Sequence, residues 1–129
     1  MHQEIDARLD ELARSVVDAA FQVHRTLGPG LLESAYGFCL SIELRKRGLP
    51  HRIQVPVSVV YDGTTIESAF RADLVVDDRL MVELKAVETL LPLHEAQLLT
   101  YLRLTGLRLG LLINFNTQRI KNGIKRLVN

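Results

Sequence analysis

Apolar residues recur every three or four positions near the start of the chain, in the spacing of an amphipathic helix. The pattern predicts a helix over 4–27, with most of its charged residues off the apolar stripe. The sequence "GPG" at 28–30 ends this helix, because glycine and proline both interrupt helical structure. A second helix is predicted from about residue 31 to 47, where Gly48 and Pro50 end it. The stripe of the first helix consists of Ile5, Leu9, Leu12, Val16, Ala20, Val23 and Leu27.

After residue 50 the pattern changes to β-branched runs separated by turn residues, which is typical of strands. The first run, "HRIQVPVSVVYDG", ends in Asp62-Gly63, a strong signal for a hairpin turn. Pro56 lies inside this run, and proline in a sheet is confined to edge strands or bulges. We therefore expect a hairpin whose first strand lies at an edge of the sheet or contains a bulge.

The remaining elements follow in the order strand, strand, helix, strand, helix. Three meandering strands, a helical crossover and a further strand imply a mixed α/β (α+β) sheet with helices packed on it. The order is thus ααβββαβα, with no repeat or linker, and we expect a single domain over 1–129. The predicted ranges are 64–76 with a break near Ser68, 79–87 after a turn at Asp77-Asp78, 92–105, 107–115 and 117–128.

Composition excludes several classes of protein. The chain has 129 residues, of which 47% are hydrophobic, and a net charge of +1, so it is globular without an overall basic character. A single cysteine, Cys39, excludes an internal disulfide framework and a cysteine-rich zinc site. The polar N-terminus is unlike a secretory signal, and no apolar run approaches the ~18 residues that span a bilayer. We expect a soluble, cytoplasmic protein that does not enter a membrane.

Three charged residues interrupt the apolar stretch "ADLVVDDRLMVELKAVE" at 72–88. Glu83 and Lys85 share one face of the predicted third strand, because side chains alternate along a strand. Asp73 lies on the preceding strand, and a hairpin centred on residue 78 would place it opposite Glu83. Two converging carboxylates repel unless a cation lies between them, and Mg²⁺ prefers oxygen ligands of this kind. Spacing alone leaves a second interpretation open, namely an exposed polar face with a cross-strand ion pair.

Two helical segments carry further candidates. Glu33 lies in the first turn of the second helix, where an acidic residue also simply complements the helix dipole. In "PLHEAQLLTYL", the side chains of His94, Gln97 and Tyr101 fall on one narrow arc of a helix. Taken singly, His94 is typical of a helix start and Tyr101 of packing.

Taken together, the motifs resemble the GxxExxY family of the PD-(D/E)xK nuclease superfamily. Gly30, Glu33 and Tyr36 match the motif of the family name, and the later motifs follow in the same order over nearly the whole chain. Ala72 stands where the superfamily motif has proline. The resemblance implies a restriction-endonuclease-like αβββαβ core with a mixed four-stranded sheet, here preceded by an extra N-terminal helix. The later motifs are Asp73, the triplet Glu83-Leu84-Lys85, and Gln97 with Tyr101.

The resemblance also implies a role for each matching residue. Asp73 and Glu83 would be metal-binding carboxylates for Mg²⁺ or Mn²⁺, Glu33 a further acidic contact to metal or water, and Lys85 the catalytic lysine. Gln97 and Tyr101 would help to hold the substrate strand, with His94 beside them on the same face. The expected activity is metal-dependent hydrolysis of phosphodiester bonds in DNA, with RNA as the second choice. The alternative is a catalytically silent nucleic-acid-binding or assembly module on the same fold.

Two features of the sequence concern possible partners, namely nucleic acid and a second copy of the chain. Two basic clusters could hold phosphates, although basic residues also favour helix C-termini. The long apolar stripe of the first helix could mediate a homodimer, or it could be core. The clusters are Arg45, Lys46, Arg47, His51 and Arg52, and Arg119, Lys121, Lys125 and Arg126, with Lys121 and Lys125 one turn apart on the predicted last helix.

Overall fold

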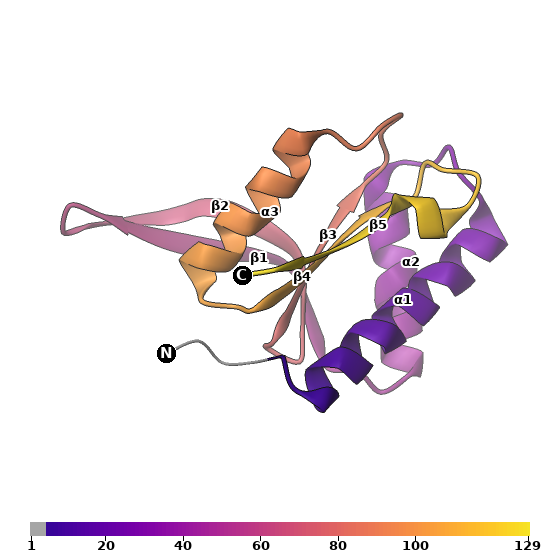
Figure 1. Cartoon of the computed structure of the whole chain (residues 1–129), viewed down its shortest axis with the longest axis horizontal. Coiled ribbons are helices and arrows are strands. Elements are labelled where there is room, and N and C mark those ends of the chain that lie inside the picture. Colours follow the sequence, from indigo (N-terminus) through magenta and orange to yellow (C-terminus); the bar gives the residue numbers. More distant parts are fainter. Residues whose placement is uncertain (1–4) are drawn as a thin grey trace.

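The computed structural model describes residues 5–129, and within them three α-helices surround one five-stranded sheet (Figure 1). The mixed α/β sheet predicted from the sequence is confirmed, with five strands in place of four. None of the helices in this range is long and apolar enough to cross a membrane. The elements are α1 (Ala7–Leu27), α2 (Glu33–Lys46), β1 (His51–Tyr61), β2 (Thr64–Val76), β3 (Leu80–Lys85), α3 (Pro92–Thr105), β4 (Leu109–Asn114), the 3₁₀ helix η1 (Ile120–Gly123) and β5 (Ile124–Val128).

The strands lie in the order β1-β2-β3-β4-β5. β1, β2 and β3 form an antiparallel meander, and β3 pairs with β4 in parallel. A parallel pair needs a crossover connection, which α3 provides. β5 then returns antiparallel to β4 and forms the second edge of the sheet.

The central strands β3 and β4 and the end of β2 are buried on both faces. α1 and α2 cover one face, where Leu74, Val82 and Leu84 join a cluster with the apolar stripe of α1. α3 covers the other face, where Leu98 and Leu102 pack on a smaller cluster that includes Val75, Met81 and Leu112. The middle of the predicted stripe is therefore core, whereas Leu27 at its end is exposed.

α3 packs closely on the sheet because β4 carries Gly110. A Cβ atom at this position would lie 3.1 Å from Leu98 and 3.2 Å from Leu102. Glycine in a strand often marks such a close approach of another element. The close packing of α3 on β4 thus depends on a residue that has no side chain.

Several predicted boundaries are confirmed to within a few residues. The first helix begins at Ala7, where Asp6 accepts a hydrogen bond from the Leu9 N–H (2.8 Å) as an N-cap. Residue 4 of the predicted range lies outside the described residues. β1 is an edge strand, as Pro56 indicated, and the β1–β2 register shifts next to the expected break at Ser68. The hairpin beyond this shift projects from the body of the molecule (Figure 1).

The predicted last helix over 117–128 is wrong. This segment forms η1 and then β5, so Lys121 and Lys125 do not lie one turn apart on a helix. The apolar residues of β5 are three apart, which resembles a helical period. They serve both faces of the sheet instead, because Ile124 packs on the α1 side and Leu127 on the α3 side.

Candidate active site

Asp73 and Glu83 face each other where the pairing of β2 and β3 ends. The two strands pair in a register centred on residue 78, so these residues are the next opposed positions along the hairpin. At this position, side-chain carboxylates replace the backbone carbonyls as acceptors of the hydrogen bonds between the two strands. The Asp73 N–H donates to Glu83 Oε1 (3.0 Å), and the Leu84 N–H donates to Asp73 Oδ2 (2.8 Å). Each carboxylate is thus fixed by the backbone of the opposite strand, which leaves its other oxygen for further contacts.

Glu83 is an almost fully buried carboxyl, with 6% of its surface exposed. Burial and the negative charge of Asp73 raise its pKa to about 8, against the lowering effects of the Asp73 N–H and the Lys85 ammonium. A carboxyl with a pKa this high keeps its proton at neutral pH when no cation is bound. A metal ion that binds such a group must displace its proton.

Lys85 follows Glu83 by two residues and is half-buried at the end of β3. Its positive charge lowers the pKa values of both Glu83 and Glu33, so it lies within electrostatic reach of two of the acidic groups. An ammonium in this place can hold a water molecule or stabilise negative charge that develops in a reaction.

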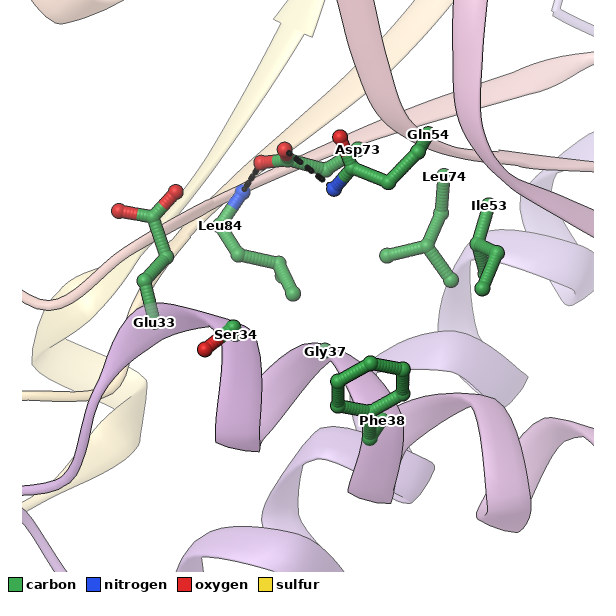
Figure 2. Close-up of a pocket in the computed structure, with 9 residues that line it drawn as sticks. All are labelled: Glu33, Ser34, Gly37, Phe38, Ile53, Gln54, Asp73, Leu74 and Leu84. Atoms are coloured by element: carbon green, nitrogen blue, oxygen red, sulfur yellow. Dashed lines mark hydrogen bonds between the residues drawn. The ribbon is translucent and has the colours of Figure 1, made fainter.

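Glu33 approaches the pair from the opposite wall of a cavity of about 390 Å³. Figure 2 shows its carboxylate at the start of α2, beside that of Asp73. Partial burial and then the Asp73 charge raise the pKa of Glu33, although much of the residue is exposed to solvent. Glu33 therefore interacts electrostatically with Asp73 but takes no part in the hydrogen bonds that join Asp73 to β3.

The α3 residues Gln97 and Tyr101 form a second polar group above the sheet. Gln97 Nε2 donates to the Tyr101 hydroxyl (2.8 Å), and the Tyr101 ring stacks on Phe70 of β2 with its centroid 3.8 Å away. Burial and the charge of Glu83 raise the pKa of Tyr101. Tyr101 is thus oriented by two neighbours and lies within the field of the carboxylates.

His94 has a local role at the start of α3. Its Nδ1 accepts a hydrogen bond from the Leu91 N–H (3.0 Å), which closes the first turn of the helix. This is the helix-start arrangement that is typical of a histidine at such a position. The helix face that His94 shares with Gln97 and Tyr101 is present as predicted.

The GxxExxY motif has a structural explanation in the loop before α2. The Tyr36 hydroxyl donates to the Gly28 carbonyl (2.6 Å) and accepts from the Leu31 N–H (3.1 Å), while its buried ring stacks on Phe115. Gly30 has φ +102°, a conformation that residues with side chains rarely adopt. The motif tyrosine and glycine thus fix the loop that carries Glu33 to the cavity.

Asn114 holds the chain beyond Lys85, a role that the sequence pattern did not predict. Its side chain accepts from the Val87 N–H (3.0 Å) and donates to the Val87 carbonyl (2.9 Å), while the Phe115 N–H donates to the Lys85 carbonyl (2.9 Å). Asn114 is 2% exposed. These bonds end β3 at Lys85, two residues before its predicted end.

Gln54 is a further residue that sequence reasoning did not find. It lies on β1 opposite Asp73, and its side-chain amide donates to Asp73 Oδ1 at 3.5 Å. Its φ of +49° is unusual for a residue inside a strand. Backbone strain of this kind is often retained at functional sites, where it directs a side chain.

The donor set fits a magnesium-type ion held by few protein ligands. No group of three or more histidine, cysteine, aspartate or glutamate residues within 5–129 is arranged to hold a metal. Mg²⁺ commonly binds through one or two carboxylates and keeps several waters, and Asp73 and Glu83 supply two. Glu33 completes an acidic wall that one divalent cation and Lys85 together would neutralise.

The basic clusters are partly paired with acids. Four of their members form ion pairs, so their charge is not all available to phosphates. The pairs are Lys46–Glu43 (3.1 Å), Arg52–Asp78 (2.9 Å), Lys125–Glu95 (3.6 Å) and Arg126–Asp10.

Comparison with known proteins assigns the chain to a superfamily. The family model described as "PD-(D/E)XK nuclease superfamily" matches residues 10–127. No curated protein and no solved structure matches significantly. The match covers all three helices except the first turn of α1, all five strands to within one residue, and the facing carboxylates of the β2–β3 hairpin. The chain therefore belongs to the PD-(D/E)XK nuclease superfamily.

Proposed function

We propose that this protein is a metal-dependent nuclease of the GxxExxY type, which hydrolyses phosphodiester bonds in DNA, with RNA as the second choice. The observation that carries the proposal is the interlocked pair Asp73 and Glu83, with Lys85 two residues further along β3. A buried carboxyl with a raised pKa next to a second carboxylate is costly for folding, and such pairs are typical of functional sites.

Asp73 and Glu83 would hold Mg²⁺ or Mn²⁺, with Glu33 in contact through water. The bound ion would polarise the phosphate and lower the pKa of a water molecule. Both carboxylates are already oriented by backbone N–H groups, so their positions need little reorganisation on binding.

Lys85 would orient the attacking water and stabilise the negative charge that develops on the phosphate. Its own position is set by the end of β3, where the Phe115 N–H bonds the Lys85 carbonyl and Asn114 holds the next turn of chain. Gln97 and Tyr101 would hold the substrate strand from the α3 side, since their hydrogen bond and the Phe70 stack fix their orientation.

The test is cleavage of single-stranded, duplex, branched and RNA substrates by the purified protein with Mg²⁺ or Mn²⁺. We expect Glu83→Ala and Lys85→Ala each to lower the rate by roughly 10²- to 10⁴-fold, the usual range for loss of a group that moves or orients a proton. Matched controls are Glu88→Ala and Lys121→Ala, which remove exposed charges of the same kinds. Wild-type protein that cleaves none of these substrates, or cleavage that survives both site substitutions, would contradict the proposal.

A non-cleaving binding module is the second candidate. It is favoured by the absence, within residues 5–129, of three or more histidine, cysteine or acidic side chains arranged to hold a metal ion. Calorimetric titration with Mn²⁺ tests whether Asp73 and Glu83 bind a metal ion or have a purely structural role. Mn²⁺ binding that disappears in Asp73→Ala would place the metal at this pair and would fit both the nuclease and the binding module. Binding of metal and nucleic acid without any cleavage would support the module.

A further inference from the structure

The cavity that contains Asp73 and Glu33 also has an apolar wall that metal binding does not explain. Nine residues line it, and Figure 2 shows the acidic groups toward one end and the Phe38 ring with Ile53 toward the other. Leu74 and Leu84 also line the cavity. At about 390 Å³ the cavity is within the range of small-molecule sites, which are mostly apolar with a few polar groups.

Phe38 is an exposed aromatic residue of α2. Of its surface, 64% is accessible, whereas the other aromatic residue of α2, Tyr36, is fully buried. The preceding residue is Gly37, which adds no side chain between Phe38 and the acidic end. An accessible aromatic face beside an open cavity is the usual arrangement for stacking on a planar ligand.

Gln54 supplies a polar group on the same cavity. Its amide lies between Asp73 and the apolar wall, and it can both donate and accept hydrogen bonds. The chemistry of the cavity therefore changes along its length: metal-binding carboxylates, then an amide, then an aromatic ring. A nucleotide carries matching groups, since its phosphate is joined through a sugar to a base that has polar edges and a flat face.

We propose that this cavity binds the base of an unpaired nucleotide, next to the phosphate that a metal ion at Asp73 and Glu83 would hold. The inference rests on the proposed function and defines its substrate class: a strand that is single-stranded at the position of cleavage. In a duplex, each base points to the helix axis and is stacked between its neighbours, so a protein that holds the phosphate from outside cannot also stack on that base.

The first experiment measures binding, so it does not depend on cleavage. Lys85→Ala protein with Mn²⁺ is titrated with a short oligothymidylate and with a strand of abasic sugar-phosphate of the same length. Stacking on one aromatic residue contributes ~1–3 kcal/mol per base, so removal of the bases should weaken binding about 5- to 150-fold. This difference should largely disappear when Phe38→Ala is added, and Phe38→Trp should restore it.

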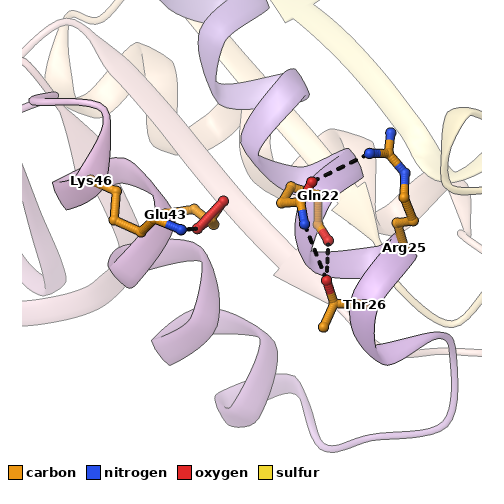
Figure 3. A network of polar contacts seen from close by, with 5 residues as sticks. All are labelled: Gln22, Arg25, Thr26, Glu43 and Lys46. Carbon is orange, nitrogen blue, oxygen red and sulfur yellow. Dashed lines mark hydrogen bonds and ion pairs between the residues drawn. The ribbon is translucent and has the colours of Figure 1, made fainter.

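Ile42 provides the matched control. It lies one helical turn after Phe38 and is also exposed, but it lines a different hollow, between α1 and α2. Figure 3 shows polar contacts at that hollow, the Lys46–Glu43 ion pair and the hydrogen bond from Gln22 to Thr26. Ile42→Ala should leave the difference between the two strands unchanged.

The second experiment compares cleavage of single-stranded and blunt duplex DNA by the wild type and by Phe38→Ala. The wild type should prefer the single strand, and Phe38→Ala should lose that preference. Equal cleavage of single-stranded and duplex DNA by the wild type would overturn the base site, as would equal effects of Phe38→Ala and Ile42→Ala on the strand preference. In either case, cleavage that is lost in Glu83→Ala would still support the nuclease proposal. No cleavage at all overturns the nuclease proposal, and the binding experiment still decides the base site. A dimer in light scattering that both alanine variants dissociate would make this face a protein interface and overturn the inference.

Discussion

Asp73 and Glu83 are similar in chemistry but differ in how the fold surrounds them. Asp73 is half-buried and lines the cavity, whereas Glu83 is buried and accepts a hydrogen bond from the Asp73 N–H. Because burial and the Asp73 charge both favour the neutral form, the Glu83 pKa is about 8. A single residue therefore couples the stability of the metal-free protein to pH.

Metal-free wild-type protein should lose stability between about pH 5 and pH 8, in comparison with Glu83→Gln. In this range folded Glu83 holds a proton that the unfolded chain has released, because the folded pKa is raised above the ordinary value of 4.5. Raising the pH therefore favours the unfolded state, by an amount on the order of a few kcal/mol. Urea unfolding in EDTA at several pH values measures the difference, and parallel pH profiles for the two proteins would refute the prediction.

At the same scale, the nearness of Asp73 and Glu83 followed from the sequence because a tight turn and the two-residue period of strands determine it. Gln54, Tyr36 and Asn114 acquire their site contacts through the fold. Gln54 meets Asp73 across β1 and β2, Tyr36 stacks on Phe115, and Asn114 reaches back to the segment after β3. Residue type and spacing contain no signal for such contacts.

At the scale of elements, local patterns predicted every helix and strand except the last two. The helices α1, α2 and α3 have clear start or stop signals, and the β1–β2 turn is marked by Asp62-Gly63. β5 could not be predicted, because its apolar residues divide between two faces and its partner, β4, is already a buried strand. Pairing with β4 overrides the helical spacing.

The turn into β5 depends on Gly123, and this yields a prediction about stability. A Cβ atom at Gly123 would collide with the backbone carbonyl oxygen of Asn114, which cannot move without disturbing β4. Gly123→Ala should therefore destabilise the protein by about 1–3 kcal/mol, as overpacking does. Gly37→Ala is the matched control, since its Cβ would meet Leu84 at an ordinary 3.6 Å and the helix should gain up to about 1 kcal/mol. Thermal unfolding of both variants checks the sign, and a stable Gly123→Ala would contradict this packing.

At the scale of the whole molecule, the clustered acidic groups determine the order in which a metal ion and a nucleic acid can bind. The chain has a net charge of +1, yet Glu33, Asp73 and Glu83 together face one lysine. A polyanion such as nucleic acid would be repelled there until a cation binds. Metal and substrate should therefore bind in a cooperative manner.

Binding of Mg²⁺ or Mn²⁺ near neutral pH should release close to one proton, because the metal displaces the proton that Glu83 holds. The release should fall toward zero above about pH 8, where Glu83 is already ionised. Calorimetry in buffers of different ionisation enthalpy counts the protons. Glu83→Gln should bind more weakly without proton release, and an unchanged proton count in this variant would refute the assignment.

The packing of α1 has a consequence for the order in which the protein is made. Its apolar stripe forms one cluster with Leu109, Leu111 and Ile120, which leave the ribosome long after it. Asp73, Glu83 and Lys85 are likewise synthesised before Asn114, whose side chain fixes the segment that follows them. A nascent chain therefore contains Asp73, Glu83 and Lys85 before it contains Asn114, which holds the segment after them. The carboxylate pair and Lys85 should therefore reach their final geometry only after β4 has been translated.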